Sequence, residues 1–263
     1  MMKDATSRSP RLSVLIDADN ANPNLIDALL KEISKYGTPQ VKRIYGDWTS
    51  PQMSKWKEQL LKFSIQPIQQ YGYTTGKNST DSALIIDAMD LLYTKKFEGF
   101  CIVSSDSDFT RLASRIRESG CLVYGLGEKK TPEPFVKACD KFIYTEILGK
   151  DNTKKDEKKK PDSKSKARDI SDSQLSFKKK IGLDEETLNL LNDAYESASE
   201  EDEWADLAAV GSQLSKLSPS FDSRNYGYKK LSGFFQSIDL FDVKETPHSN
   251  NPSAKVFHIR LKS

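Results

Sequence analysis

The chain has 263 residues, of which 37% are hydrophobic and 30% charged, and this suits one large domain or two modest ones with some polar linker. Nowhere does an apolar run reach the ~18–20 residues that a membrane-spanning helix needs. The N-terminal residues also lack the apolar segment of a secretory signal. The sequence therefore predicts a cytoplasmic protein with no membrane partner.

The net charge of +2 conceals an uneven distribution along the chain. Residues 150–180 contain 12 Lys or Arg against 6 Asp or Glu, and almost no large apolar residue. This composition predicts a basic disordered linker, and residues 1–10 are also expected to be disordered. Basic segments are typical of proteins that bind polyanions, but a solvated tether explains the same residues equally well.

The three cysteines, Cys101, Cys121 and Cys139, are odd in number and lie in apolar surroundings. They are expected to be reduced thiols, as in cytosolic proteins. A zinc site is not expected, because the cysteines show no paired spacing and both histidines, His248 and His258, are far away in sequence.

Short apolar runs and helical repeats alternate through the first half of the chain. Buried strands are predicted at 12–16, 41–45, 65–69, 100–103, 121–124 and 142–147. Helices are predicted between them, the first with Asn22 as its N-cap and Pro23 in its first turn. Such alternation indicates an α/β fold over residues 11–149, with a mostly parallel sheet covered by helices on both faces.

The pattern changes after the linker. Three helical segments are predicted, from Leu183, from Trp204 to Leu217 and from Tyr226 to Phe235. Alternating residues at 241–243 and 256–259 then indicate a β-hairpin. Three helices and a hairpin predict a small winged-helix domain over residues 181–263.

Carboxylates follow two of the predicted strands. Asp17 ends the first strand, Asp106 and Asp108 follow the fourth, and Asp81 begins the helix that leads into the fourth. Ligands of open parallel sheets bind beyond the carboxyl ends of the strands, so these four side chains are expected to converge at one edge.

Crowded carboxylates repel one another and persist mainly where a cation lies between them. Oxygen ligands select hard ions, so the four Asp predict a Mg²⁺ or Mn²⁺ site that activates water for attack on a phosphodiester. Asn20 is expected to hold a carboxylate or the attacking water. The ordinary alternative for each single Asp, Asp108 in particular, is a helix cap.

Other polar residues near this edge are less clearly assigned. The role of Asp19 stays open. Asp87 lies six residues after Asp81, about 240° further round the helix, and should point elsewhere, while Asp90 is expected at the surface. Lys77 and then Arg111 are candidates to bind phosphates, although helical Lys and Arg are usually only solvated.

Three segments carry a family resemblance: LSVLIDADN, KNSTDSALIIDAMD and IVSSDSDF. From about Arg11 to Leu148 the chain resembles the NYN domains of the PIN-like nuclease superfamily, in the LabA-like branch. The resemblance implies a metal-dependent nuclease acting on RNA. It also implies that the family's motif positions are Asp17, Asn20, Asp81, Asp106 and Asp108. NYN-type domains can pair, so a homodimer is an open alternative.

The C-terminal segment contains Trp204, Val210-Gly211 and FDSRNYGYKKL, and from about Leu183 to Leu261 it resembles the LOTUS or OST-HTH domain. That family implies binding of RNA or, in some members, of protein partners. The basic candidates for RNA contact are Arg224, Lys229 and Lys230, with Lys244 and Lys255 on the hairpin. Tyr228 is a candidate for stacking on a base, and most other aromatic residues are expected in the core.

The sequence leaves three hypotheses for the function. The leading hypothesis is a ribonuclease with a C-terminal RNA-binding module. A non-catalytic RNA- or protein-binding adaptor is the second. The third is a phosphatase of the haloacid dehalogenase type using Asp17 as nucleophile and Asp19 as acid, although Ala21 stands where that family usually has Thr or Val.

Overall fold

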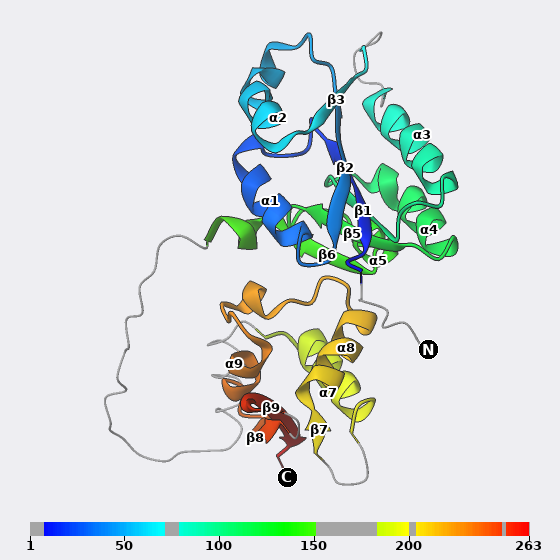
Figure 1. Cartoon of the computed structure of the whole chain (residues 1–263). Coiled ribbons are helices and arrows are strands. Elements are labelled where there is room, and N and C mark those ends of the chain that lie inside the picture. The colour runs from blue at the N-terminus through cyan, green and yellow to red at the C-terminus, as the bar shows by residue number, and fades with distance from the viewer. Residues whose placement is uncertain (1–7, 72–78, 151–182, 200–203, 249–250, 263) are drawn as a thin grey trace. The chain divides into compact units, whose positions relative to one another are not determined.

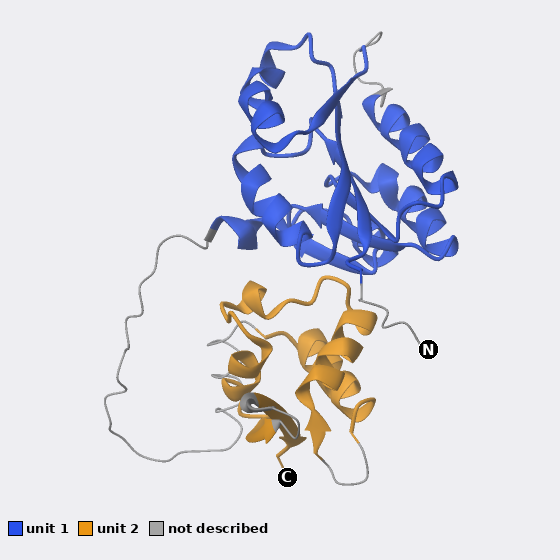
Figure 2. Cartoon of the chain, in the orientation of Figure 1, with its two compact units in different colours: residues 1–152 blue, residues 153–263 orange. Residues whose placement is uncertain are grey.

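A computed structural model describes residues 8–71, 79–150, 183–199, 204–248 and 251–262. The chain divides into two compact units, residues 1–152 and 153–263, which are described separately (Figure 2). The described residues do not include Lys77, most of the predicted linker or most of the N-terminal segment. Within the described residues, no helix combines the length and apolarity that crossing a membrane demands.

The first unit is built on a six-stranded parallel sheet, as predicted. Its strands are β1 (Arg11–Asp17), β2 (Thr38–Gly46), β3 (Gln66–Gln69), β4 (Gly99–Val103), β5 (Leu122–Gly127) and β6 (Lys141–Tyr144). The spatial order is β3-β2-β1-β4-β5-β6, and each neighbouring pair is parallel. The order reverses between β1 and β4, which lie side by side, and open sheets of this kind bind ligands at that point.

Helices cover both faces of this sheet (Figure 1). One face carries α1 (Ile26–Ile33) and α2 (Lys57–Phe63), and the other carries α3 (Ser79–Tyr93), α4 (Thr110–Glu118) and α5 (Glu133–Ala138). Strand β1 divides its side chains between two buried clusters: Val14 and Ile16 pack on the α1 side, and Leu15 packs on the α3 side. A continuous apolar strand is what a sheet buried on both faces requires.

The observed ends of the helices and strands match the sequence predictions in part. Asn22 caps the turn that starts at Pro23, since its side chain accepts from Asn24 N at 3.0 Å. Helix α3 begins at Ser79, two residues before Asp81. Strand β6 ends at Tyr144 and a 3-10 helix, η4 (Thr145–Lys150), follows, so the predicted last strand extended too far.

The second unit contains the predicted three helices and hairpin, but the third helix begins at Leu231 and not at Tyr226, which ends a separate 3-10 helix (Ser223–Tyr226). The helices and hairpin strands are α7 (Glu185–Glu196), α8 (Leu207–Leu217), α9 (Leu231–Gln236), β8 (Phe241–His248) and β9 (Asn251–Leu261). A short strand, β7 (Ala205–Asp206), joins the antiparallel sheet in the order β7-β9-β8. Trp204 therefore precedes a strand and does not belong to the second helix. Helix α8 begins after Asp206, which caps it: the Asp206 carboxylate accepts from Ala208 N at 2.6 Å.

Aromatic side chains fill the core of the second unit, as expected. Phe234 and Phe235 are fully buried, and Phe221, Tyr226 and Tyr228 pack their rings on Phe234.

In the first unit the three cysteines are free thiols, and burial raises the pKa of Cys139 to about 12. These thiols are therefore uncharged packing groups.

Candidate metal centre

The centre of the carboxyl edge is Asp17, the last residue of β1. Its side chain is buried, and three donors hold it. The Ser104 hydroxyl donates to Oδ2 at 2.8 Å, the Asn20 amide donates to Oδ2 at 2.7 Å, and the Asp19 backbone N–H donates to Oδ1 at 3.1 Å. These donors satisfy both oxygens of the buried carboxylate and fix its orientation. Asn20 thus holds a carboxylate, one of the two roles expected for it.

Asp106 and Asp108 follow β4, and hydrogen bonds connect them to Ser104, which also binds Asp17. Ser104 Oγ accepts from Asp106 N at 3.1 Å, and Asp106 Oδ1 accepts from Asp108 N at 2.9 Å. Asp106 is therefore the N-cap of η3 (Ser107–Phe109). The capping role considered for Asp108 belongs to Asp106, and Asp108 is exposed.

Three carboxylates meet at this edge although they are distant in sequence. Asp81, in the first turn of α3, joins Asp106 and Asp108, and one carboxylate oxygen from each lies within 4.8 Å of the others. Hard divalent cations prefer ligand sets made of oxygen atoms. The residues present thus fit a Mg²⁺ or Mn²⁺ ion.

The electrostatics of the edge reflect this crowding. Burial, followed by the charges of Asp17, Asp106, Asp108 and Asp19, raises the pKa of Asp81 to about 6. Asp17 is the largest of the charge contributions, so it lies within electrostatic reach of the cluster. A cation would relieve the repulsion that raises this pKa.

Asp19 shares in the same repulsion. Desolvation raises its pKa, and so do the charges of Asp17 and Asp47. Asp47 directly follows β2 at the edge where Asp17 ends β1, so it is a further carboxylate at this edge that the sequence reasoning missed. Its Oδ1 accepts from the Thr49 hydroxyl at 2.6 Å and from the Gln69 amide at 2.9 Å.

The two remaining acids of α3 lie away from the cluster, as predicted. Asp87 accepts hydrogen bonds from Arg43 and from the Tyr45 hydroxyl, both on β2. Asp90 is exposed. The 240° rotation between Asp81 and Asp87 therefore separates a candidate ligand from a packing ion pair on one helix.

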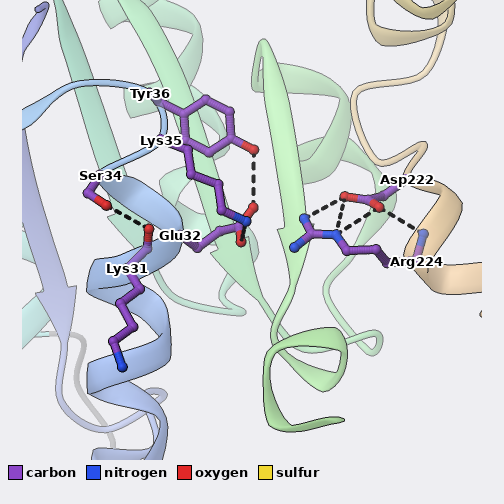
Figure 3. Close-up of polar contacts among 7 residues, drawn as sticks. All are labelled: Lys31, Glu32, Ser34, Lys35, Tyr36, Asp222 and Arg224. Carbon is purple, nitrogen blue, oxygen red and sulfur yellow. Dashed lines mark hydrogen bonds and ion pairs between the residues drawn. The ribbon is translucent and has the colours of Figure 1, made fainter. Parts of the chain in front are cut away.

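The candidate RNA-binding residues have different surroundings. Arg111 is exposed on α4, and Lys229 and Lys230 are exposed before α9. Arg224 is half-buried, and its Nη2 lies 2.7 Å from Asp222 Oδ2 (Figure 3). The charge of Arg224 is thus already balanced by a carboxylate, whereas the two lysines face solvent.

Ser104 is the second residue that the sequence reasoning missed. Its hydroxyl bridges Asp17 on β1 and the Asp106 backbone after β4. The available signal was its position, because it is the first residue after a buried strand and directly precedes the acidic segment.

The fold and the acidic edge define a nuclease-type α/β domain joined to a small winged-helix domain. The chain belongs to the NYN domain family, whose match covers residues 11–148. An OST-HTH/LOTUS domain matches residues 181–252. Both matches agree in order with the resemblances in the sequence, and both kinds of domain are RNA-associated. Among curated proteins, none matches the chain.

Three solved structures are similar to parts of the chain. A protein of unknown function from Vibrio parahaemolyticus is 16% identical, with a TM-score of 0.45, over 54% of this chain and 94% of that one. An uncharacterized protein from Nitrosomonas europaea is 28% identical, with a TM-score of 0.28, over 42% and 93%. A fragment from Chromobacterium violaceum is 40% identical, with a TM-score of 0.23, over 28% and 76%.

Proposed function

We propose that this protein is a divalent-metal-dependent ribonuclease that hydrolyses RNA phosphodiester bonds. The observation that carries the proposal is the convergence of Asp81, Asp106 and Asp108, whose carboxylate oxygens lie within 4.8 Å of one another. They meet near the buried Asp17, at the switch point of the sheet, where the strand order reverses between β1 and β4. Acids that repel one another at a ligand-binding edge favour a cation. Family membership favours RNA as the substrate.

In this proposal Asp81, Asp106 and Asp108 hold Mg²⁺ or Mn²⁺, with Asp17 as a fourth ligand or as the anchor of the cluster. Such an ion lowers the pKa of a bound water and neutralises charge on the phosphate. Asn20 and Ser104 orient Asp17 by donating to its Oδ2. Asp108 and Arg111 are exposed, so an RNA chain in solvent can reach them.

The second domain, proposed to span residues 181–263, supplies RNA affinity in this account. Lys229 and Lys230 contact phosphates there, and the lysine-rich segment 150–180 adds sequence-independent attraction. A tether also raises the effective concentration of bound RNA at the first domain, proposed to span residues 11–149. A protein partner for the second domain is the alternative.

The phosphatase alternative requires Asp17 to attack a phosphate. Asp17 is only 1% exposed, and both of its carboxylate oxygens already accept hydrogen bonds. A buried carboxylate held in this way is a poor nucleophile, so the geometry argues against an aspartyl-phosphate enzyme.

The test is an RNA and DNA cleavage panel, single-stranded and structured, with Mg²⁺, Mn²⁺ or EDTA. The proposal expects RNA cleavage that EDTA abolishes and that Asp17→Asn and Asp106→Asn each eliminate. Asp90→Asn, an exposed acid on α3, is the matched control and should cleave normally. Tight RNA binding without cleavage under every metal would support the adaptor instead.

A further inference from the structure

A cleft of about 220 Å³ opens at the same edge of the sheet as the acidic cluster, on the α1 side. Its large aliphatic lining residues are Leu25, Leu29, Val103 and Leu126. Val103 and Leu126 are paired residues near the carboxyl ends of β4 and β5, so the cleft lies beside the switch point. None of the residues described above as metal ligands lines it.

Two contacts connect the cleft to the acidic edge. Asn20 lines the cleft and donates to Asp17, and Glu128 lines it and donates its backbone N–H to Ser105 Oγ at 2.8 Å. Ser105 directly precedes Asp106. A group seated in the cleft would therefore lie beside the acidic edge, where the proposed function has the phosphodiester bind.

The size and lining of the cleft select a particular kind of ligand. Pockets for drug-sized molecules measure roughly 300–1,000 Å³, so this smaller cleft suits a single ring system. Its lining residues include four large aliphatic side chains and no Lys, Arg or His. Apolar walls without a basic residue disfavour a phosphate and favour an uncharged planar group.

Two of the polar lining residues, Glu128 and Glu146, carry carboxylates that can contact the edge of such a group. Glu128 is held by Lys130 at 2.8 Å, and Glu146 accepts from Lys129 N at 2.8 Å through Oε1. Carboxylates accept hydrogen bonds and cannot donate them when ionised. They match the edge of a base that presents N–H groups, and guanine presents a ring N–H beside an amino group.

We propose that this cleft binds the base of one nucleotide beside the cleaved phosphate, with a preference for guanine. Single-stranded RNA is commonly read in this way, by hydrogen bonds to the exposed edges of unstacked bases. The inference deepens the proposed ribonuclease function and depends on it for its biological meaning. The binding of a base can nevertheless be measured without cleavage.

The test is a titration of the full chain in EDTA with each of the four nucleoside 5′-monophosphates, followed by methyl NMR. The proposal expects shifts confined to the methyl groups of Leu25, Leu29, Val103 and Leu126, with GMP binding at least on the order of tenfold more tightly than UMP. Absence of shifts at millimolar nucleotide would overturn it, and so would equal binding of all four.

Two variants and a control sharpen this test. Glu146→Gln should weaken GMP binding by about tenfold, and Ala21→Leu, which adds bulk to a residue lining the cleft, should weaken all four nucleotides. Glu133→Gln, on α5 and outside the cleft, should change neither. Unchanged GMP binding in both lining variants would contradict the site. Nucleotide binding in a chain that cleaves no RNA would refute the nuclease and leave the base site standing.

Discussion

The Ser104 hydroxyl donates a 2.8 Å hydrogen bond to Asp17 Oδ2 and so links the ends of two adjacent strands. The same oxygen accepts from the Asp106 backbone at 3.1 Å. One buried hydroxyl therefore sets the position of the carboxylate on β1 and of the acidic segment after β4. The geometry of the candidate metal centre depends on this small polar bridge.

Replacing Ser104 by Ala should disturb both stability and metal binding. Asp17 would lose one donor while remaining buried, which costs about 1–3 kcal/mol of unfolding free energy. Urea unfolding and Mn²⁺ calorimetry measure the two effects. Ser107→Ala, at an exposed position in η3, is the control and should resemble the wild type. Wild-type stability and Mn²⁺ affinity in Ser104→Ala would show that the bridge is dispensable.

The raised pKa of Asp81 predicts an unusual dependence of stability on pH. Its value of about 6 in the fold exceeds the ordinary value of 3.8, so between these pH values the native state keeps a proton that the unfolded state has lost. The contribution of Asp81 to stability is therefore lost as pH rises from about 4 to 6 in EDTA. Saturating Mn²⁺ at pH 7 should restore stability, because the ion binds the native carboxylates.

The measurement is urea unfolding from pH 4 to 8 for the wild type and Asp81→Asn, because other carboxylates add their own slopes. The difference between the two proteins isolates residue 81. Removing a mutually repelled carboxylate should make the variant relatively more stable above pH 6 in EDTA. A difference that does not change with pH would contradict the crowding of Asp81.

Asp87 lies on the same helix as Asp81 but should matter for stability alone. Asp87→Ala leaves Arg43 and the Tyr45 hydroxyl without their shared acceptor, which should cost about 1–3 kcal/mol. Mn²⁺ affinity should be unchanged, and Asp90→Ala should alter neither quantity. Loss of Mn²⁺ binding in a folded Asp87→Ala protein would show that the helix was assigned the wrong face.

In the second domain, the exposed Lys229 and Lys230 should contribute to RNA affinity. The double variant Lys229→Ala/Lys230→Ala should lower RNA affinity and reduce the slope of log K against log salt by about 1.4, or about 0.7 for each phosphate contact on a single strand. Fluorescence anisotropy from 50 to 300 mM KCl measures it. Lys216→Ala, exposed on α8, is the control, and an unchanged slope in the double variant would exclude these lysines from the interface.

Much of the fold follows from periodicity in the sequence. The run ending at Asp17 and the run ending before Ser104 have the composition of fully buried strands, and the helical repeats between them require parallel crossovers. Parallel strands bring their carboxyl ends to one edge, so the approach of Asp81 to Asp106 was predictable without coordinates. The position of Asp87 followed from helical geometry.

Other features depend on information that local patterns do not contain. The partners of Ser104 require β1 and β4 to be neighbours, and strand order is a property of the whole sheet. The cleft beside Asn20 likewise requires β5 to pair with β4. The ion pair between Arg224 and Asp222 depends on a turn whose shape the composition does not reveal. Ile147 continues an apolar pattern, yet it lies in a 3-10 helix after β6.

The most direct test of the central claim is the rate of cleavage of a labelled single-stranded RNA as a function of Mn²⁺ concentration, compared among wild type, Asp81→Asn and Asp90→Asn. Both substitutions lie on α3 and remove one acid. The account predicts saturable cleavage in the wild type and in Asp90→Asn, and a loss at least on the order of 100-fold in Asp81→Asn. Equal rates in the two variants, or cleavage that persists in EDTA, would contradict it.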